Sequence, residues 1–344
     1  MATVGWIKPP KLSICIATLN RGHLIGDTLE SIRRQMTPEC EIVVLDGAST
    51  DNTEALLSTY AKSHPGVRYF RQATNSGIDR DYDKAVQFAR GEYCWLMSDD
   101  DLLMPGAITA VLDTLSGSPS LVVVNVEARS TDMSALVQRR FLDFDVDRIY
   151  EPAEMDRLFS DIANRLAGYV GCMVIRRDIW IERERERYFG SLYVYLGVIF
   201  QRPLPGRAMI IAQPLVSYRA ATEHTFSSRL FEVMCIRWPS IVWSLALSEH
   251  TKRQVCPPEA WRRFPNLFLA RGFGLYGPAE FRRYVLPLSK SSRTAFFPAV
   301  AARFPGALAN LLCIFSYKLS KSAIADYQLY MLRKSQFYPF GRLP

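Results

Sequence analysis

The chain of 344 residues is 49% hydrophobic and 22% charged, a composition that excludes an intrinsically disordered protein and allows one large domain or two ordinary ones. Its formal net charge of +8 is unevenly distributed, because residues 251–344 hold 15 Lys and Arg against 3 Asp and Glu, whereas the remainder holds 27 against 31. The seven cysteines show no CxxC spacing, which favours a reduced, cytoplasmic protein over a disulfide framework or a zinc site. No apolar run reaches the roughly 18 residues of a membrane-spanning helix, so we expect neither such a helix nor a signal peptide.

Predicted strands and helices alternate over the first 126 residues. Continuous apolar runs predict buried strands at residues 12–17, 41–45, 67–71, 93–97 and 121–126. Helical spacing of apolar residues predicts helices at 24–34, 53–61, 81–89 and 105–115. This alternation predicts an α/β fold, with a mostly parallel, Rossmann-like sheet and helices on both of its faces.

The pattern loosens after residue 130. Two more strands are expected, at 170–175 and 208–214, and the alternating Glu and Arg of residues 182–187 predict a solvated helix face with ion pairs. Beyond residue 230 the chain is expected to be helical. Residues 272–277 match GxGxxG, but Pro278 follows at once and no acid lies between Glu280 and Asp326, so we expect no dinucleotide site there.

Polar clusters follow three of the predicted strands directly. The first strand is followed by Thr18, Asn20 and Arg21, the second by Asp46 and Ser49, and the fourth by Ser98, Asp99, Asp100 and Asp101. In parallel sheets, ligands bind beyond the carboxyl ends of the strands. The three clusters are therefore expected to open onto one edge of the sheet.

The run of three aspartates is the sharpest single signal. Adjacent carboxylates repel one another, and a cation would relieve that repulsion. Mg²⁺ and Mn²⁺ prefer oxygen ligands, often one or two carboxylates together with substrate phosphates. The alternative is a solvated turn in which an aspartate caps the following helix.

Four blocks in order carry a resemblance to a known family. They are SICIATLNR at residues 13–21, VLDGASTDNT at 44–53, NSGIDRDYDKA at 75–85, and ARGEY at 89–93 leading into LMSDDD at 96–101. Together they resemble the family 2 glycosyltransferases of the GT-A fold over roughly the first 125 residues, with abequosyltransferase-like enzymes of bacterial O-antigen assembly as the nearest group suggested. The family often has two consecutive acids where this chain has Asp46 and Gly47, which leaves the nucleotide base open.

The resemblance implies a role for individual residues. The donor-binding residues would be Thr18, Asn20, Arg21, Asp46, Ser49, Asp79, Arg80 and Asp99. A divalent cation, Mg²⁺ or Mn²⁺, would be held by Asp100 and Asp101. Because Ser98 replaces the first acid of the usual Asp-x-Asp, Asp100 is expected to be the main ligand.

The acceptor side is less well defined by the sequence. An inverting transfer needs a general base, usually Asp or Glu. The family's downstream Glu-Asp pair is missing from residues 189–200, where Tyr193 and Tyr195 occur instead. The acidic candidates are Asp178, Glu182, Glu184, Glu186 and Glu223, and His224 is a further candidate; none of them is well supported.

The resemblance also implies partners, a location and a division of the chain. The substrates would be a nucleotide-sugar donor and a saccharide acceptor linked to a polyprenyl lipid, in surface polysaccharide (O-antigen or capsule) synthesis. Residues 1–230 would form the GT-A domain, with a nucleotide-binding half at 10–126 and an acceptor half at 127–230. The helical, basic region at 231–344 suits peripheral contact with an anionic membrane on its cytoplasmic side.

Other interpretations remain open at this stage. The basic region could also consist of packed helices with basic outer faces, and a nucleic-acid partner is not expected. A sugar nucleotidyltransferase would use a similar sheet and acidic site, but it usually carries a Gly-rich loop after the first strand, where this chain offers only Gly22. A non-catalytic nucleotide-sugar-binding protein would explain the missing Glu-Asp pair.

Overall fold

The computed structural model describes residues 9–222, 229–320, 322 and 324–341. These residues form two compact units. The first unit holds the chain up to Glu127, together with Arg139–Arg219 and Leu245–Leu247. The second unit holds Ala128–Gln138, Ala220–Ser244 and the rest of the chain from Ser248. The second unit thus takes a short segment from the middle of the chain and begins its main part at Ala220.

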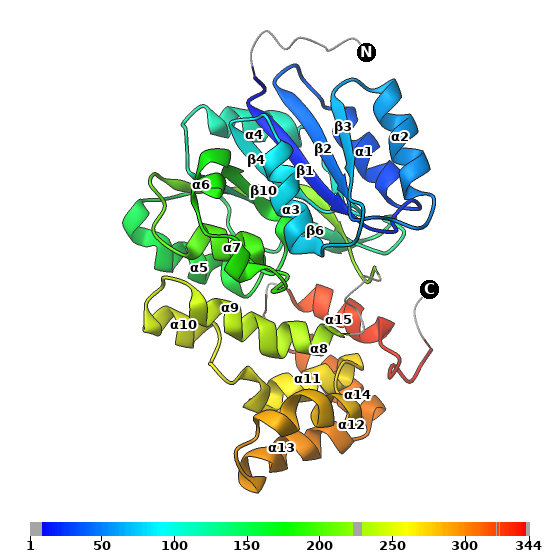
Figure 1. Cartoon of the computed structure of the whole chain (residues 1–344). Helices are drawn as coiled ribbons and strands as arrows, with labels where there is room; N and C mark the ends of the chain where they lie inside the picture. The colour runs from blue at the N-terminus through cyan, green and yellow to red at the C-terminus, as the bar shows by residue number, and fades with distance from the viewer. Residues whose placement is uncertain (1–8, 223–228, 321, 323, 342–344) are drawn as a thin grey trace. The chain divides into compact units, whose positions relative to one another are not determined.

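The first unit is built on a mixed sheet whose first four strands are parallel (Figure 1). Its strands are β1 (Leu12–Thr18), β2 (Cys40–Asp46), β3 (Val67–Arg71), β4 (Tyr93–Met97), β5 (Leu102–Leu103), β6 (Leu121–Arg129), β8 (Arg148–Tyr150), β9 (Met173–Arg176) and β10 (Ala208–Arg219). The spatial order is β3-β2-β1-β4-β9-β6-β10-β5. Strand β9 lies between β4 and β6 and runs antiparallel to both. The predicted parallel half is confirmed, and an antiparallel half completes the sheet.

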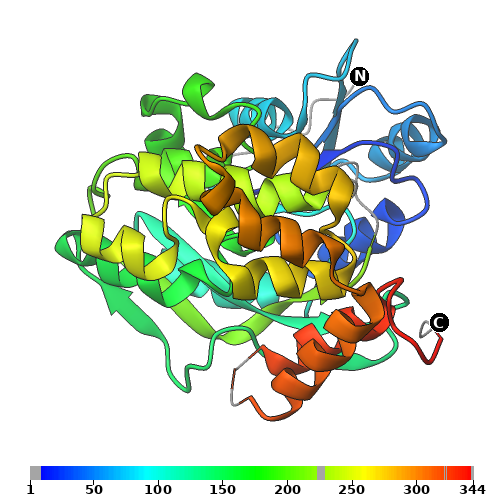
Figure 2. The ribbon, with the colours of Figure 1, turned by 90° about the horizontal axis from the view of Figure 1, so that it is seen from below.

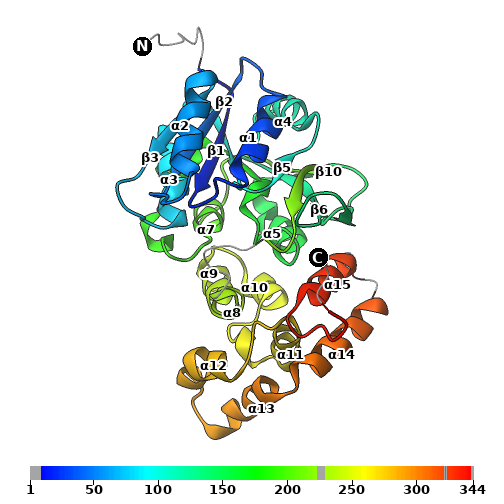
Figure 3. The same ribbon diagram turned by 90° about the vertical axis from the view of Figure 1, so that its right-hand side faces the viewer.

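Helices cover both faces of this sheet (Figure 3). They are α1 (Ile25–Arg33), α2 (Thr53–Ser63), α3 (Ile78–Phe88), α4 (Ala107–Leu115), α5 (Met155–Ala163), α6 (Arg177–Glu182) and α7 (Val194–Phe200). Every residue of β1, β2 and β4 is buried, which explains why these strands read as continuous apolar runs. The ends of these buried strands are therefore fixed in position.

Residues 182–187 do not form the predicted solvated helix face, so that interpretation is wrong. Helix α6 ends at Glu182, and Arg183 is only 4% exposed. Its guanidinium donates to the carbonyls of Val198 (2.9 Å), Ile199 (2.6 Å) and Pro203 (2.7 Å). It therefore satisfies carbonyls at the end of α7 that the helix leaves without partners. Burial lowers the pKa of Arg183 to about 10.

The second unit is helical over most of its length. It contains α8 (Leu230–Glu232), a π-helical turn (Val233–Arg237), α9 (Trp238–Ser244), α10 (Glu249–Val255), α11 (Phe264–Phe273), α12 (Pro278–Glu280), α13 (Ser292–Arg303), α14 (Gly306–Lys318) and α15 (Ala325–Lys334), and the short strand β7 (Leu136–Gln138). The GxGxxG run caps a helix, because Gly274 ends α11 in the left-handed conformation with φ 82°. The element directly before the end of this run is helix α11 rather than a strand, so the run does not open a dinucleotide fold.

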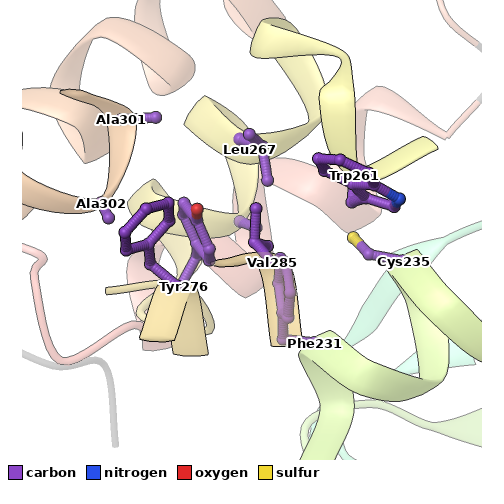
Figure 4. Packing of buried hydrophobic residues seen from close by; sticks show 10 residues of the cluster. Phe231, Cys235, Trp261, Leu267, Tyr276, Val285, Ala301 and Ala302 are labelled. Carbon is purple, nitrogen blue, oxygen red and sulfur yellow. The ribbon is translucent and has the colours of Figure 1, made fainter. Parts of the chain in front are cut away.

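The second unit has its own hydrophobic core (Figure 4). The ring of Phe231 stacks on that of Tyr276, with centroids 4.6 Å apart, and Trp261 and Val285 belong to the same cluster. Buried Asn310 on α14 donates to the carbonyls of Gly272 and Leu332 at 3.0 and 2.8 Å, which ties α14 to α11 and α15 (Figure 2). These contacts stabilise the helices independently of the sheet.

Candidate functional site

Three strand ends bring the predicted polar residues to one edge of the sheet. Thr18 pairs with Asp46 at the ends of β1 and β2, and Ile16 pairs with Met97 at the end of β4. The strands are parallel, so the loops that follow them leave the sheet on the same side. The convergence expected from the order of the elements is therefore present in the structure.

The loops after β1 and β2 are bonded to each other. The backbone N–H of Asn20 donates to Oγ of Ser49 at 2.9 Å, and Oδ1 of Asn20 accepts from the backbone N–H of Thr50 at 2.7 Å. The N–H of Arg21 donates to Oγ1 of Thr53 at 3.0 Å. Asn20 and Ala48 both have positive φ, 56° and 72°. Non-glycine residues seldom adopt this conformation, and these reciprocal hydrogen bonds hold it.

Asp46 organises the second loop from inside the protein. Its carboxylate is fully buried, with Oδ1 accepting from the N–H of Ser49 at 2.8 Å and Oδ2 from the hydroxyl of Tyr69 at 2.9 Å. The neighbouring Gly47 is required by space, because a Cβ there would lie 2.6 Å from Oδ2 of Asp81. Asp81 is buried, which raises its pKa. A second acid at position 47 would meet that carboxyl group, which explains the departure from the consecutive acids of the family.

The three aspartates of the run are buried, and each has different partners. Oδ1 of Asp99 lies 3.8 Å from Nε of Arg21, and Oδ1 of Asp100 accepts from the hydroxyl of Ser98 at 2.5 Å. Asp101 accepts at both oxygens, from the hydroxyl of Tyr169 and from the backbone N–H of Arg219, each at 2.6 Å. Asp101 is therefore held on one side by Tyr169 and on the other by the backbone of strand β10.

Burial and mutual repulsion disfavour negative charge in this run. Burial raises the pKa of Asp99 to about 7, and the nearby charge of Asp100 adds to the rise, while Thr18 and Arg21 oppose it. Burial also raises the pKa of Asp101 well above its usual range, again with a contribution from Asp100. These shifts are the signature of a site that lacks positive charge.

The carboxylate oxygens of the run suit a cation that takes only some of its ligands from the protein. Among the described residues, no group of three or more His, Cys, Asp or Glu side chains is arranged to hold a metal ion. Asp100 offers carboxylate oxygen, which suits Mg²⁺ or Mn²⁺, and such ions keep several positions for water or phosphate oxygen. With both oxygens already hydrogen-bonded, Asp101 is placed to support the run rather than to complete a cage.

The two residues from the third block lie at the start of α3 and contact a later segment. Asp79 accepts from the backbone N–H groups of Leu192 (2.9 Å) and Val194 (3.1 Å), at the beginning of α7. Leu192 has φ 70°, an unusual conformation that these bonds hold in place. The guanidinium of Arg80 lies over the ring of Phe189, 4.4 Å from its centroid. Both side chains thus shape residues 189–194, and their predicted contact with a donor stays a prediction.

The acceptor-side candidates gain no supporting contact from the structure. Glu186 is exposed at the start of a short 3₁₀ turn (Glu186–Tyr188). Glu223 and His224 lie outside the described residues. Where the family's Glu-Asp pair was sought, Tyr193 and Tyr195 are buried, and the hydroxyl of Tyr195 donates to the carbonyl of Ala167 at 2.8 Å.

Three functional neighbours of the run were not found from the sequence. Tyr169 and Arg219 bind Asp101, and Nε of Arg219 also donates to the carbonyl of Asp100 at 2.8 Å. Tyr82, on α3, donates to the carbonyl of Met97 at 3.0 Å, just before the run. Tyr169 and Arg219 reach partners far away in the sequence and belong to none of the four blocks, whereas Tyr82 lies in the third block but was not singled out there.

A comparison with protein families identifies the first unit. Residues 13–183 match the model described as "Glycosyl transferase family 2". These residues form a family 2 glycosyltransferase domain. The match contains the three loops and the aspartate run, so the resemblance seen in the four sequence blocks is confirmed.

Curated relatives extend the similarity beyond this domain. The abequosyltransferase of Salmonella typhimurium is 24% identical over 224 residues, which cover 62% of this chain and 67% of that protein. A GalNAc(5)-diNAcBac-PP-undecaprenol beta-1,3-glucosyltransferase of Campylobacter jejuni is 31% identical over 104 residues, 30% of this chain and 34% of that one. The relatives that are more than 30% identical are matched over only 18 to 34% of their own length.

Solved structures confirm the fold. TarS 1-349 of S. aureus, in complex with UDP-GlcNAc, aligns with a TM-score of 0.55 and 15% identity over 94% of this chain and 91% of that chain. Mannosyltransferase PcManGT from Pyrobaculum calidifontis, in complex with GDP-Man and Mn²⁺, aligns with a TM-score of 0.51 and 16% identity over 95% and 87%. At these identities the likeness establishes the GT-A fold of this family 2 chain.

Proposed function

We propose that this family 2 chain transfers a sugar from a nucleotide-sugar donor to a saccharide acceptor in the synthesis of a bacterial surface polysaccharide. The observation that carries the proposal is the buried run Asp99–Asp101 at the end of β4, beside the interlocked loops after β1 and β2. A divalent cation, bound together with the diphosphate of a nucleotide donor, would supply positive charge beside these buried carboxylates.

The donor would lie across the loops after β1 and β2. Asn20, Arg21 and Ser49 sit in those loops, and Asp99 would face the ribose or sugar with Arg21 beside it. The support from relatives is the binding of UDP-GlcNAc and of GDP-Man named for two structures of the same fold. Those two nucleotides differ in base, and the binding assay below determines which base this chain binds.

A divalent cation would be held by Asp100 together with the donor diphosphate. When bound, it would neutralise the charge that develops on the departing nucleoside diphosphate. Asp101 would fix the position of Asp100 through its bonds to Tyr169 and Arg219, which makes it a positioning residue. The Mn²⁺ named for PcManGT supports this assignment by analogy of fold.

The acceptor would be a saccharide on a polyprenyl diphosphate. The support is the undecaprenol-linked substrate named for the Campylobacter relative and the abequosyltransferase named for the Salmonella relative. Such an acceptor is found at the cytoplasmic face of the plasma membrane, where we place the chain as a peripheral protein. Glu186, Glu223 and His224 stay the candidates for the general base.

The test pairs donor binding with turnover. The chain is screened by thermal shift with UDP-, CDP-, GDP- and dTDP-sugars and Mn²⁺, because a ligand that binds the native state raises the melting temperature. The donor that binds is then used to measure the release of nucleoside diphosphate. Release of pyrophosphate instead would identify a nucleotidyltransferase, and binding without release would identify a non-catalytic protein.

The metal assignment is tested with Asp100→Asn. This change keeps the shape of the side chain, and we expect release to fall by roughly two orders of magnitude or more with the melting temperature preserved. Asp145→Asn is the matched control, because Asp145 is an exposed aspartate paired with Arg140 at 3.1 Å. Full turnover by Asp100→Asn, or unchanged turnover in a chelator, would refute the metal-dependent mechanism.

A further inference from the structure

Helices α13 and α14 expose large apolar side chains to solvent. On α13, Phe296 and Phe297 are 61 and 62% exposed, and on α14 Phe315 is 64% exposed. Leu308 and Leu312 are about half exposed, and Leu319, just after α14, is 71% exposed. We call these six side chains the α13–α14 outer face. Large apolar side chains that are exposed together on two consecutive helices mark a candidate interaction site.

This face is additional to the side that packs into the unit. On α14, Leu308, Leu312, Phe315 and Leu319 recur at intervals of four, three and four residues, which places them on one stripe of the helix. Ala309 and Cys313 lie on the opposite side and are buried. On α13, Ala301 and Ala302 are completely buried. Both helices therefore carry apolar side chains on their exposed side as well as on the side that packs into the unit.

The charge around the outer face has a single sign. From Phe281 to Ala325 the chain holds seven Lys and Arg and no Asp or Glu. Arg293 at the start of α13, Arg303 at its end and Lys318 at the end of α14 are exposed. Apolar side chains flanked by cations only are complementary to a surface that is apolar inside and anionic outside.

The geometry favours a surface that lies on a bilayer. Among the described residues, no single helix is long and apolar enough to cross a membrane. Helices α13 and α14 meet such a criterion only when taken together, and they are bent by 92° at the break between them. With 12 and 13 residues, each helix is also shorter than the roughly 20 residues that a span needs.

We propose that the α13–α14 outer face docks on an anionic lipid bilayer, with its Phe and Leu side chains among the acyl chains and Arg293, Arg303 and Lys318 at the headgroups. The proposal does not depend on the transfer chemistry, because it concerns only the second unit. It names the physical means by which a peripheral enzyme would reach a lipid-linked acceptor.

The test is co-sedimentation of the full chain with vesicles, without donor or acceptor. Two compositions are used, phosphatidylcholine alone and phosphatidylcholine with phosphatidylglycerol. We expect binding to the anionic vesicles that weakens as salt is raised, and little binding to phosphatidylcholine alone. Absence of binding to the anionic vesicles would overturn the proposal.

Two variants distinguish binding through this face from nonspecific adsorption to vesicles. Phe297→Ser with Phe315→Ser removes two inserted rings, and we expect the affinity for anionic vesicles to fall roughly tenfold or more. Val146→Ser is the control, because Val146 is 72% exposed in the first unit. We expect it to bind as the unchanged chain does. Equal binding by the double variant would overturn the proposal.

A second copy of the chain is the competing occupant. Analytical ultracentrifugation without lipid would reveal it as a dimer that the double variant abolishes, and that result would overturn the membrane assignment. Donor turnover is measured on the same variants with a water-soluble acceptor. Because the outer face takes no part in the chemistry, turnover should be unchanged, so failure of docking and failure of transfer give different results.

Discussion

Replacing Asp99 with Asn should stabilise the metal-free protein at neutral pH while impairing its function. Asp99 is buried, and burial together with repulsion from Asp100 raises its pKa from 3.8 to about 7. Between these two values the folded protein keeps a proton that the unfolded chain has lost, so this group's contribution to stability falls as pH rises. Above pH 7 the carboxylate is charged in both states, and the full penalty applies.

The magnitude follows from the shift. About three pKa units at roughly 1.4 kcal/mol each give a penalty of up to about 4 kcal/mol at pH 8, as an order of magnitude. Asn keeps the shape of the side chain but carries no charge, so Asp99→Asn should be more stable than the unchanged chain at pH 8. At pH 4, where Asp99 is protonated in the folded state, the two should be nearly equal.

The assay is urea unfolding of both proteins in chelator across pH 4 to 8. The difference in unfolding free energy between them reports the burial of Asp99 together with its charge interactions with Asp100 and Asp101. Asp145→Asn again serves as the exposed control for the loss of one carboxylate. A variant that is less stable than the unchanged chain at pH 8, or a difference that does not grow with pH, would refute the reasoning.

Two further predictions concern the side chains that support α7. Arg183→Leu should lower the unfolding free energy by roughly 3 kcal/mol, because two buried carbonyls and one partly buried carbonyl lose a charged donor. Arg187→Leu, at an exposed position, should change it little, and equal effects in urea unfolding would contradict this role. Asp79→Ala should release the segment around Leu192, seen as faster cleavage there in limited proteolysis followed by mass spectrometry, and an unchanged cleavage pattern would show that the two hydrogen bonds are dispensable.

The sequence predicted the parallel half of the sheet closely because burial on both faces leaves an unmistakable pattern. The segments expected at 67–71 and 93–97 coincide with β3 and β4. Strand β9 was expected as a strand. Its place between β4 and β6 depends on pairing across about eighty residues of chain, and the periodicity of a single segment does not predict such pairing. Local patterns define an element, whereas its neighbours are set by the whole chain.

The candidate site likewise contains residues that local patterns predicted and residues that depend on distant contacts. The run after β4 and the loops after β1 and β2 were found because they follow strands and match family blocks. The supports were missed because each is a single residue reaching a distant partner, as Arg219 reaches Asp101 and Asp79 reaches Val194. Arg183 was misread for a related reason, since alternating charge looks solvated until the carbonyls it satisfies are known.

The bonds between the loops after β1 and β2 carry a thermodynamic consequence. Asn20 and Ala48 hold left-handed conformations, and Ser49 and Thr50 fix the first of them through hydrogen bonds within the protein. A donor would therefore meet a preorganised cradle and lose little affinity to ordering the protein. The site would then discriminate strongly among nucleotides, because the loops would not adjust to a base of the wrong shape.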